Sequence, residues 1–259
     1  MKLIENAALR RMRAGDTALG MQLRLARSGE IAGLARVTGH DWIMMDMQHS
    51  GIDVATIVQI SLACFGFDIT PVVRISGIDS PDTVRLLDAG VMGIILPDTR
   101  NAGQARALVE KCKFTPLGGR SVTTGYVTLG YEPLPIDIAA RTLNDQTMVV
   151  CMIESLEGLE NLDEIAAVEG VDVIHMGCND LLMDMGLPGQ FGCPQIQAAL
   201  DRLLAVCAQH GKFAGSGGDR DVERQRAFIA AGGRFVTTDN DMGFLRLEAT
   251  RKVERLRQG

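Results

Sequence analysis

Eight short apolar runs recur along this chain of 259 residues, and a segment with helical spacing follows each of them. Residues 149–153 (Val-Val-Cys-Met-Ile) are apolar at consecutive positions, which is typical of parallel strands buried on both faces. Glycine, proline, aspartate or asparagine flanks the runs, as expected for turns. The sequence therefore predicts strands at Ala18–Leu23, Trp42–Asp46, Pro71–Arg74, Gly93–Pro97, Met148–Glu154, Asp172–Gly177, Lys212–Ser216 and Arg234–Thr238.

This alternation predicts an α/β fold, either a doubly wound sheet or a closed barrel. A dinucleotide-binding doubly wound sheet needs a GxGxxG turn after its first strand, and residues 19–23 lack one. Eight strands, in a chain close to the roughly 250 residues of a typical barrel, favour one (β/α)₈ TIM barrel domain over residues 1–259. Helices are expected at 28–38, 52–62, 81–89 (capped by Ser80), 102–111, 158–168, 195–208 and 222–231.

The connection between the fourth and fifth predicted strands is unusually long. After helix 102–111 it continues through residues 114–144, which include the glycine-rich segment 118–121. Long connections in compact domains are usually lids or interface segments. We expect Arg120, within this segment, to be an exposed surface arginine.

Composition restricts the partners. The formal net charge is −6 without a basic block, and aromatic residues make up only 4%, which argues against nucleic acid and anionic membranes. Six scattered cysteines without paired spacing are typical of reduced thiols in a cytoplasmic protein. Neither a signal peptide nor an apolar run of membrane-spanning length is found. A small-molecule substrate is therefore expected.

Charged residues cluster where the predicted strands end, which is where barrels carry their catalytic groups. Glu154 and Asp180 end neighbouring strands, and two carboxylates at one rim repel each other unless a cation lies between them. Hard oxygen ligands favour Mg²⁺ or Mn²⁺, with Co²⁺ as a further candidate. The alternative is that both residues cap the helices that follow them.

Two further strands end in candidate catalytic residues. His49 lies three residues after Asp46, and a carboxylate bonded to an imidazole suits a general base. The alternative is a solvent-facing loop histidine. Arg74 offers a guanidinium fork to a carboxylate or an enolate oxygen. It can also form a structural pair with Asp88, and Asp88 can orient either Arg74 or His49.

Other mechanisms are disfavoured. Schiff-base chemistry needs a buried lysine, and Lys212, the one lysine next to a predicted strand core, begins its strand at the wrong rim. A GxSxG nucleophile motif is absent from the sequence. Residues 216–218 (Ser-Gly-Gly) are a weak candidate for an anion cradle, with Ser216 contacting substrate. His175, inside a predicted strand, is expected to be a packed core residue.

Five segments, in order, resemble the HpcH/HpaI aldolase family of metal-dependent pyruvate aldolases, which act on 4-hydroxy-2-oxo and 2-keto-3-deoxy acids. They span most of the chain, from about Leu19 to Leu256. These segments are residues 41–50 (DWIMMDMQHS), 72–74 (VVR), 86–90 (LLDAG), 152–154 (MIE), and 170–172 (GVD) leading to 177–181 (GCNDL).

The resemblance implies a barrel whose last helix is exchanged between neighbouring subunits, in a homohexamer that is a trimer of dimers. It also implies roles for the site residues: Glu154 and Asp180 as metal ligands, His49 as general base with Asp46 as its partner, Arg74 as the group that stabilises the enolate, Asp88 as a second buried aspartate, and Asn179 as the donor of a backbone N–H to the substrate carboxylate.

Four positions depart from the family pattern. Many members have Glu in place of Gln48 and Gln in place of Met152, and Cys178-Asn179 replaces the usual Pro-Ala or Pro-Thr. These changes affect the pocket rather than the metal ligands. The expected substrate contacts are Arg74, Met152, Gly177, Asn179, Asp180 and Ser216.

The predicted reaction is the making and cleaving of a C–C bond between the enolate of pyruvate, or of a related 2-keto acid, and an aldehyde. One alternative is a lyase of the same superfamily that acts on a CoA thioester or a phosphoenolpyruvate-type substrate. The other is a non-catalytic protein that binds keto acids.

Overall fold

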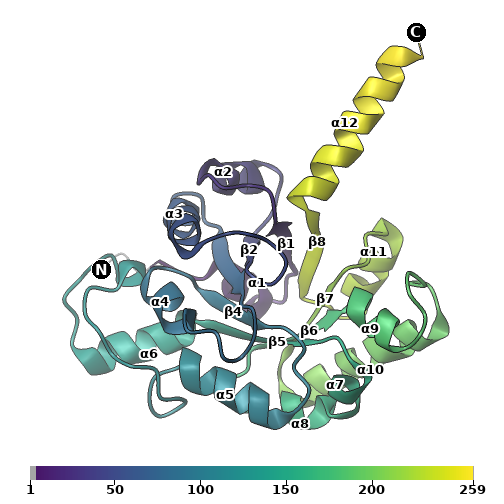
Figure 1. Ribbon diagram of the computed structural model, residues 1–259. Helices are drawn as coiled ribbons and strands as arrows, with labels where there is room; N and C mark the ends of the chain where they lie inside the picture. The colour runs from purple at the N-terminus through teal and green to yellow at the C-terminus, as the bar shows by residue number, and fades with distance from the viewer. Residues whose placement is uncertain (1–3, 259) are drawn as a thin grey trace.

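The strands close into a parallel barrel in chain order in the computed structural model, which describes residues 4–258 (Figure 1). Each strand pairs with the next, and the last pairs with the first, so the predicted (β/α)₈ barrel is confirmed. All eight predicted strands are found within one or two residues of their expected bounds. They are β1 (Ala18–Leu23), β2 (Trp42–Asp46), β3 (Thr70–Arg74), β4 (Gly93–Leu96), β5 (Met148–Ile153), β6 (Val173–Gly177), β7 (Phe213–Gly217) and β8 (Phe235–Asn240).

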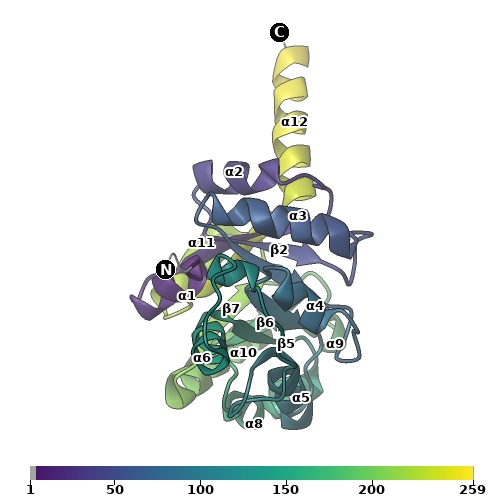
Figure 2. The same ribbon diagram turned by 90° about the vertical axis from the view of Figure 1, so that its left-hand side faces the viewer.

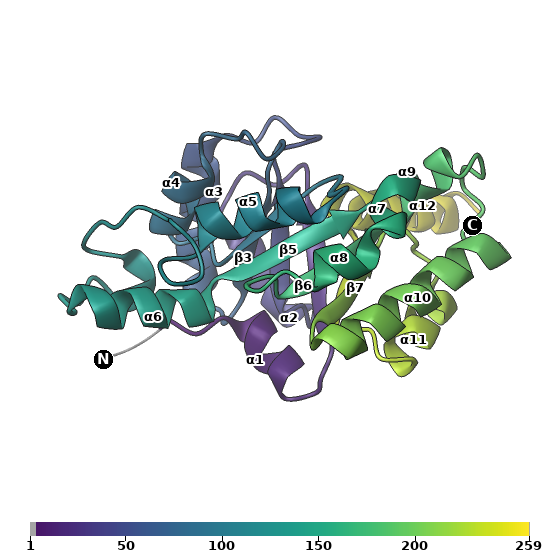
Figure 3. The ribbon, with the colours of Figure 1, turned by 90° about the horizontal axis from the view of Figure 1, so that it is seen from below.

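Helices surround this barrel, and Figure 3 shows α5, α8 and α10 along the outside of the strands. The helices, with one 3-10 turn, are α1 (Ala7–Arg13), α2 (Glu30–Val37), α3 (Val54–Phe65), α4 (Thr83–Asp88), α5 (Ala102–Cys112), η1 (Val127–Leu129), α6 (Ile136–Gln146), α7 (Leu156–Glu160), α8 (Leu162–Ala166), α9 (Cys178–Asp184), α10 (Pro194–His210), α11 (Val222–Ala230) and α12 (Asp241–Arg257).

Two helix predictions were wrong in detail. The segment predicted as one helix at 158–168 is divided into α7 and α8, with Asn161 between them. Helix α4 begins at Thr83 rather than at Pro81, because residues 81 and 82 form a turn and Asp82, not Ser80, occupies the N-cap position.

The strands are apolar on both faces because each face has its own core. Alternate residues fill the barrel interior, where Trp42 stacks on Phe235 with ring centroids 3.9 Å apart. Gly20 is required beside this pair, since a Cβ there would lie 2.0 Å from the Trp42 ring. Leu9 and Met12 of α1 belong to the same cluster and close the amino-terminal end of the barrel. The remaining strand residues pack against the surrounding helices.

Helix α12 projects away from the barrel, as two perpendicular views show (Figures 1 and 2). None of its side chains is buried, and Leu245, Leu247 and Leu256 are each at least 60% exposed. Several large exposed apolar side chains on one helix indicate a surface that can pack against another one. None of the helices within residues 4–258 is long and apolar enough to cross a membrane.

Candidate active site

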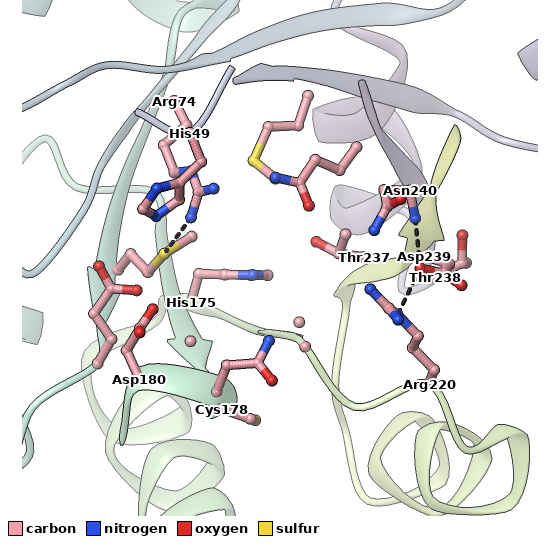
Figure 4. Close-up of a pocket in the computed structure, with 18 of the residues that line it drawn as sticks. His49, Arg74, His175, Cys178, Asp180, Arg220, Thr237, Thr238, Asp239 and Asn240 are labelled. Carbon is pink, nitrogen blue, oxygen red and sulfur yellow. Dashed lines mark hydrogen bonds and ion pairs between the residues drawn. The ribbon is translucent and has the colours of Figure 1, made fainter. Parts of the chain in front are cut away.

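A cavity of about 250 Å³ opens at the carboxyl ends of the strands (Figure 4). The structure brings most of the predicted site residues to its wall: His49, Arg74, Met152, Glu154, Gly177, Asn179 and Asp180. Asp46 lies directly behind Arg74, whereas Asp88 and Ser216 do not line this cavity.

Asp46 and Arg74 are paired across neighbouring strands. They are register partners at the ends of β2 and β3, and Arg74 Nε and Nη2 donate to the two Asp46 carboxylate oxygens at 3.0 and 2.7 Å. Burial alone would raise the pKa of Asp46, but the Arg74 guanidinium, together with the backbone N–H groups of Gln48 and His49, outweighs burial and holds that pKa below its usual value. Gln22 also donates to Asp46, at 2.8 Å. The two bonds from Arg74 to Asp46 therefore hold the guanidinium in one orientation, in which the side that is not bonded to Asp46 faces the cavity.

Asp46 also organises the turn that carries His49. Its carboxylate accepts the backbone N–H groups of Gln48 and His49 at 3.1 and 3.3 Å. Arg24 donates to the backbone carbonyl of His49 at 3.0 Å. The expected bond from Asp46 to the imidazole is not formed, because Arg74 and these backbone groups occupy both carboxylate oxygens. The His49 imidazole lies instead at the cavity wall beside Arg74 (Figure 4).

Glu154 and Asp180 face the same end of the cavity. Burial raises the pKa of Glu154 to about 7; the backbone N–H of Asp98, which donates to Glu154 at 2.8 Å, opposes this rise, and the nearby Asp180 carboxylate adds to it. Residue 177 must be glycine for this arrangement, since a Cβ there would lie 2.6 Å from Glu154 Oε2.

The helix-capping alternative does not account for these two carboxylates. Helix α7 is capped by Ser155, whose hydroxyl accepts the N–H of Gly158. Asp180 lies within the first turn of α9, after the N-cap residue Gly177. Both carboxylates are therefore left to act in the cavity.

This donor set fits a hard divalent cation. Two carboxylates at one cavity end, one of them with a raised pKa, gain from a positive charge between them. Across residues 4–258, no cluster of three or more His, Cys, Asp or Glu side chains suitable for a metal is found. The chain would thus contribute two ligands and leave coordination positions open for substrate and water.

Asp88 belongs to a different part of the molecule. Its carboxylate accepts from Arg120 Nη2 at 2.7 Å, where α4 meets the long connection. The Arg120 side chain is 1% exposed and lies over the rings of Phe114 and Tyr126, 4.6 and 5.8 Å from their centroids. The expectation of an exposed Arg120 was therefore wrong. Within one chain Asp88 orients neither Arg74 nor His49, because Arg120 holds it at the outside of the barrel.

Ser216 was expected to contact substrate, but it does not line the cavity. Its hydroxyl lies 3.6 Å from Cys178 Sγ, and its register partners Met176 and Val236 belong to the core between strands and helices. Alternation along β7 turns Ser216 outward and leaves Gly217 and Gly218 at the cavity.

The sequence-based prediction missed the far side of the cavity. Its lining includes His175 on β6 and a group from β1, β8 and the adjacent loops: Gln22, Arg24, Arg220, Thr237, Thr238, Asp239 and Asn240. His175 is buried, as predicted, but it also borders the cavity. Period-two counting back from Gly177 places residue 175 on the inward face, and this signal could have identified it.

Comparison with known proteins identifies the family of the chain. A family model described as HpcH/HpaI aldolase/citrate lyase matches residues 23–246. The chain belongs to this family. An HpcH/HpaI aldolase from Desulfitobacterium hafniense has the same fold, with a TM-score of 0.92 at 24% identity, and the match covers 97% of this chain and 96% of that one.

Two similar proteins with named activities are both aldolases. A 4-hydroxy-4-methyl-2-oxoglutarate aldolase of Hapsidospora irregularis is 35% identical, covering 96% of this chain and 94% of that protein. A hydroxypyruvate/pyruvate aldolase of Sagittula stellata is 32% identical, covering 96% and 97%. The prediction of a carbon–carbon lyase with aldolase chemistry of the pyruvate type is confirmed.

Proposed function

We propose that this HpcH/HpaI family member is a metal-dependent aldolase that cleaves 4-hydroxy-2-oxo acids to pyruvate, or a related 2-keto acid, and a carbonyl compound. The observation that carries the proposal is the meeting of Glu154 and Asp180 with Arg74 and His49 at one end of one cavity. The names of the two relatives support the substrate class.

Glu154 and Asp180 would hold a divalent cation, Mg²⁺ or Mn²⁺ (Co²⁺ being a further candidate), which supplies Lewis-acid stabilisation of the enolate when bound. Arg74, fixed by Asp46, directs positive charge at the same oxygen without reorganising during the reaction. The backbone N–H of Asn179, in the first turn of α9, would bind the substrate carboxylate, because helix amino ends attract anions. Gly177 and Met152 shape this end of the cavity, and Met152 Sδ lies 4.0 Å from Arg74 Nη1.

His49 would move the proton at C3 of the keto acid. Its imidazole borders the cavity beside Arg74, and histidine exchanges protons near neutral pH. Asp46 contributes by fixing the backbone of the turn rather than by bonding the ring. In the cleavage direction the C4 hydroxyl loses its proton as the C3–C4 bond breaks, and His49 would deliver a proton to C3 of the resulting enolate.

The deciding experiment is exchange of the C3 protons of pyruvate for deuterium in metal-supplemented buffer, followed by NMR. Exchange that a chelator abolishes and added metal restores supports the proposal, and chelator-resistant exchange overturns it. Borohydride with pyruvate should leave the enzyme unmodified. A lyase acting on CoA thioesters or phosphoenolpyruvate, or a non-catalytic keto-acid binding protein, would not exchange these protons. A panel of 4-hydroxy-2-keto acids with coupled pyruvate detection then identifies the preferred substrate.

We also propose a cytoplasmic homo-oligomer, a hexamer built as a trimer of dimers, in which α12 is exchanged between subunits. The exposed leucines of α12 and its projection away from the barrel support the exchange (Figures 1 and 2). The free cysteines within the described chain support the location. Light scattering on the full chain and on a chain ending at Asn240 tests the exchange, because the shortened chain should lose the native assembly.

A further inference from the structure

The cavity extends beyond the groups used above to a second set of polar side chains from β6 and β8. Figure 4 shows His175 between the end that holds His49 and Asp180 and the end that holds Thr237 and Asn240. An aldolase must bind two reactants side by side, and the first end accounts for only one of them.

His175 has no hydrogen-bond partner within the described part of the protein at either ring nitrogen. The residue is 1% exposed and its ring lies edge-on to Phe235. Nδ1 is buried on the side of Gly215, whereas Nε2 lies on the side of Gly217 and Thr237. Burial, with a smaller contribution from Arg74, lowers the pKa of His175 to about 3, so that the imidazole is neutral at physiological pH. A neutral imidazole has one donor and one acceptor nitrogen.

Thr237 presents a second unpartnered polar atom, because its Oγ1 is buried without a hydrogen bond. Gly217 keeps the space between the two side chains open. A Cβ on residue 217 would lie 2.9 Å from His175 Nε2 and 3.1 Å from Thr237 Oγ1. Two polar groups that border one open space, without protein partners, are arranged to receive a ligand atom, since burying them unpaired is costly.

We propose that His175 and Thr237 form the acceptor pocket of the aldolase and bind a hydroxyl group carried by the acceptor carbonyl compound. This inference rests on the proposed function and adds the substrate class, a short hydroxylated aldehyde. A hydroxyl both donates and accepts, which matches an imidazole nitrogen and a threonine hydroxyl.

A carboxylate fits this pair less well. The pair carries no positive charge. Two cations border this side, and both have partners: Arg220, in the loop between β7 and α11, is bound to Asp239 at 2.6 Å, and Arg24 donates to the backbone carbonyl of His49 at 3.0 Å. Sites built to hydrogen-bond a substrate hydroxyl discriminate strongly against analogues that lack it.

The test compares pyruvate addition to glycolaldehyde, which has the hydroxyl, with addition to acetaldehyde, which lacks it. The metal-loaded enzyme should prefer glycolaldehyde in kcat/KM. His175→Phe keeps a ring against Phe235, and Thr237→Val keeps the shape of the side chain. Each should lower the glycolaldehyde-to-acetaldehyde ratio about tenfold or more, as expected for a lost hydrogen bond to substrate.

Pyruvate proton exchange should remain in both variants, because it needs no acceptor. Gly217→Ala retains both polar groups but fills the space between them, and it should lower the same ratio. His210→Phe, on the exposed end of α10, is the matched control and should leave the ratio unchanged. Thermal melting verifies that each variant is folded.

Three results would overturn the inference: an unchanged ratio in both His175→Phe and Thr237→Val, an equal loss for both aldehydes together with proton exchange, or a wild-type preference for glyoxylate that these variants lose. Absence of pyruvate proton exchange in the wild-type enzyme would instead refute the proposed function.

Discussion

Arg74 and Asp46 face each other at the ends of β3 and β2, joined by two hydrogen bonds between the guanidinium and the carboxylate. This pair links the fold to the site. Strand register places the two residues side by side, and the carboxylate then fixes the arginine that borders the cavity. A single charge without the planar fork would satisfy only part of this geometry.

Replacing Arg74 by Lys should therefore impair catalysis although the charge is kept. We expect kcat/KM for retro-aldol cleavage to fall about 100-fold or more, the loss typical of a displaced oxyanion-stabilising group. Steady-state kinetics with a cleavable 4-hydroxy-2-keto acid measures this. Arg85→Lys, at an exposed pair on α4, is the matched control and should have wild-type kinetics. Wild-type kinetics in Arg74→Lys would remove the fork from the mechanism.

His49→Ala tests the proposed proton transfer separately from metal binding. Pyruvate C3 exchange should slow by about 10²-fold or more, the range of general acid–base contributions. The affinity for Mn²⁺, measured by titration calorimetry, should change little, because the proposed ligands are Glu154 and Asp180. If exchange continues at the wild-type rate, another group is the base.

The raised pKa of Glu154 predicts an unusual pH dependence of stability for the metal-free protein. Its pKa is raised from 4.5 to about 7 in the folded chain, so the folded state retains a proton that the unfolded state has already lost. The associated stability is fully present below pH 4.5, decreases as the pH rises toward 7, and is absent above it. Glu154→Gln removes this titration. At pH 8, with chelator, the variant should exceed the wild type in free energy of unfolding by up to about 3 kcal/mol.

The wild type and the Glu154→Gln variant should also respond differently to metal. Mn²⁺ should raise the melting temperature of the wild type at pH 8, because a ligand that binds only the folded state stabilises it. The melting temperature of Glu154→Gln should rise much less, because the variant lacks one of the proposed ligands. Denaturant unfolding with chelator at pH 4.5, 6 and 8 provides the series, and parallel pH slopes for the two proteins would contradict the assignment of the raised pKa to Glu154.

The sequence was sufficient for the barrel because its signals are local and repeated. Consecutive apolar residues such as Val149 to Ile153 identify strands whose two faces are both buried, and strand ends locate Arg74, Glu154 and Asp180. The prediction of Ser216 as a substrate contact failed because position along a strand does not specify which face a side chain occupies. Counting in steps of two from Gly217 on β7 would have turned Ser216 outward, and counting from Gly177 on β6 would have turned His175 inward.

Pairing partners were harder to predict than positions. Asp46, Asp88 and Arg120 were all recognised as notable, but which cation meets which carboxylate depends on the path of the long connection. That path is set by its own small core, which includes Phe114, Tyr126 and Leu129, and it brings Arg120 to Asp88 from a distant part of the sequence.

Breaking the Arg120–Asp88 pair should accordingly lower the stability of the fold while leaving the rate of aldol cleavage nearly unchanged. Asp88→Asn leaves the buried guanidinium without its counter-charge, which typically costs about 3–5 kcal/mol for a buried pair. Asp88 is 30% exposed, so we expect a loss nearer 2 kcal/mol, measured by denaturant unfolding, with kcat for aldol cleavage within about threefold of wild type well below the melting temperature. Glu223→Gln, at the exposed pair with Arg226, is the matched control and should change stability by less than about 0.5 kcal/mol. A large fall in kcat without loss of stability would instead place Asp88 in the chemistry, through a contact that a single chain does not make.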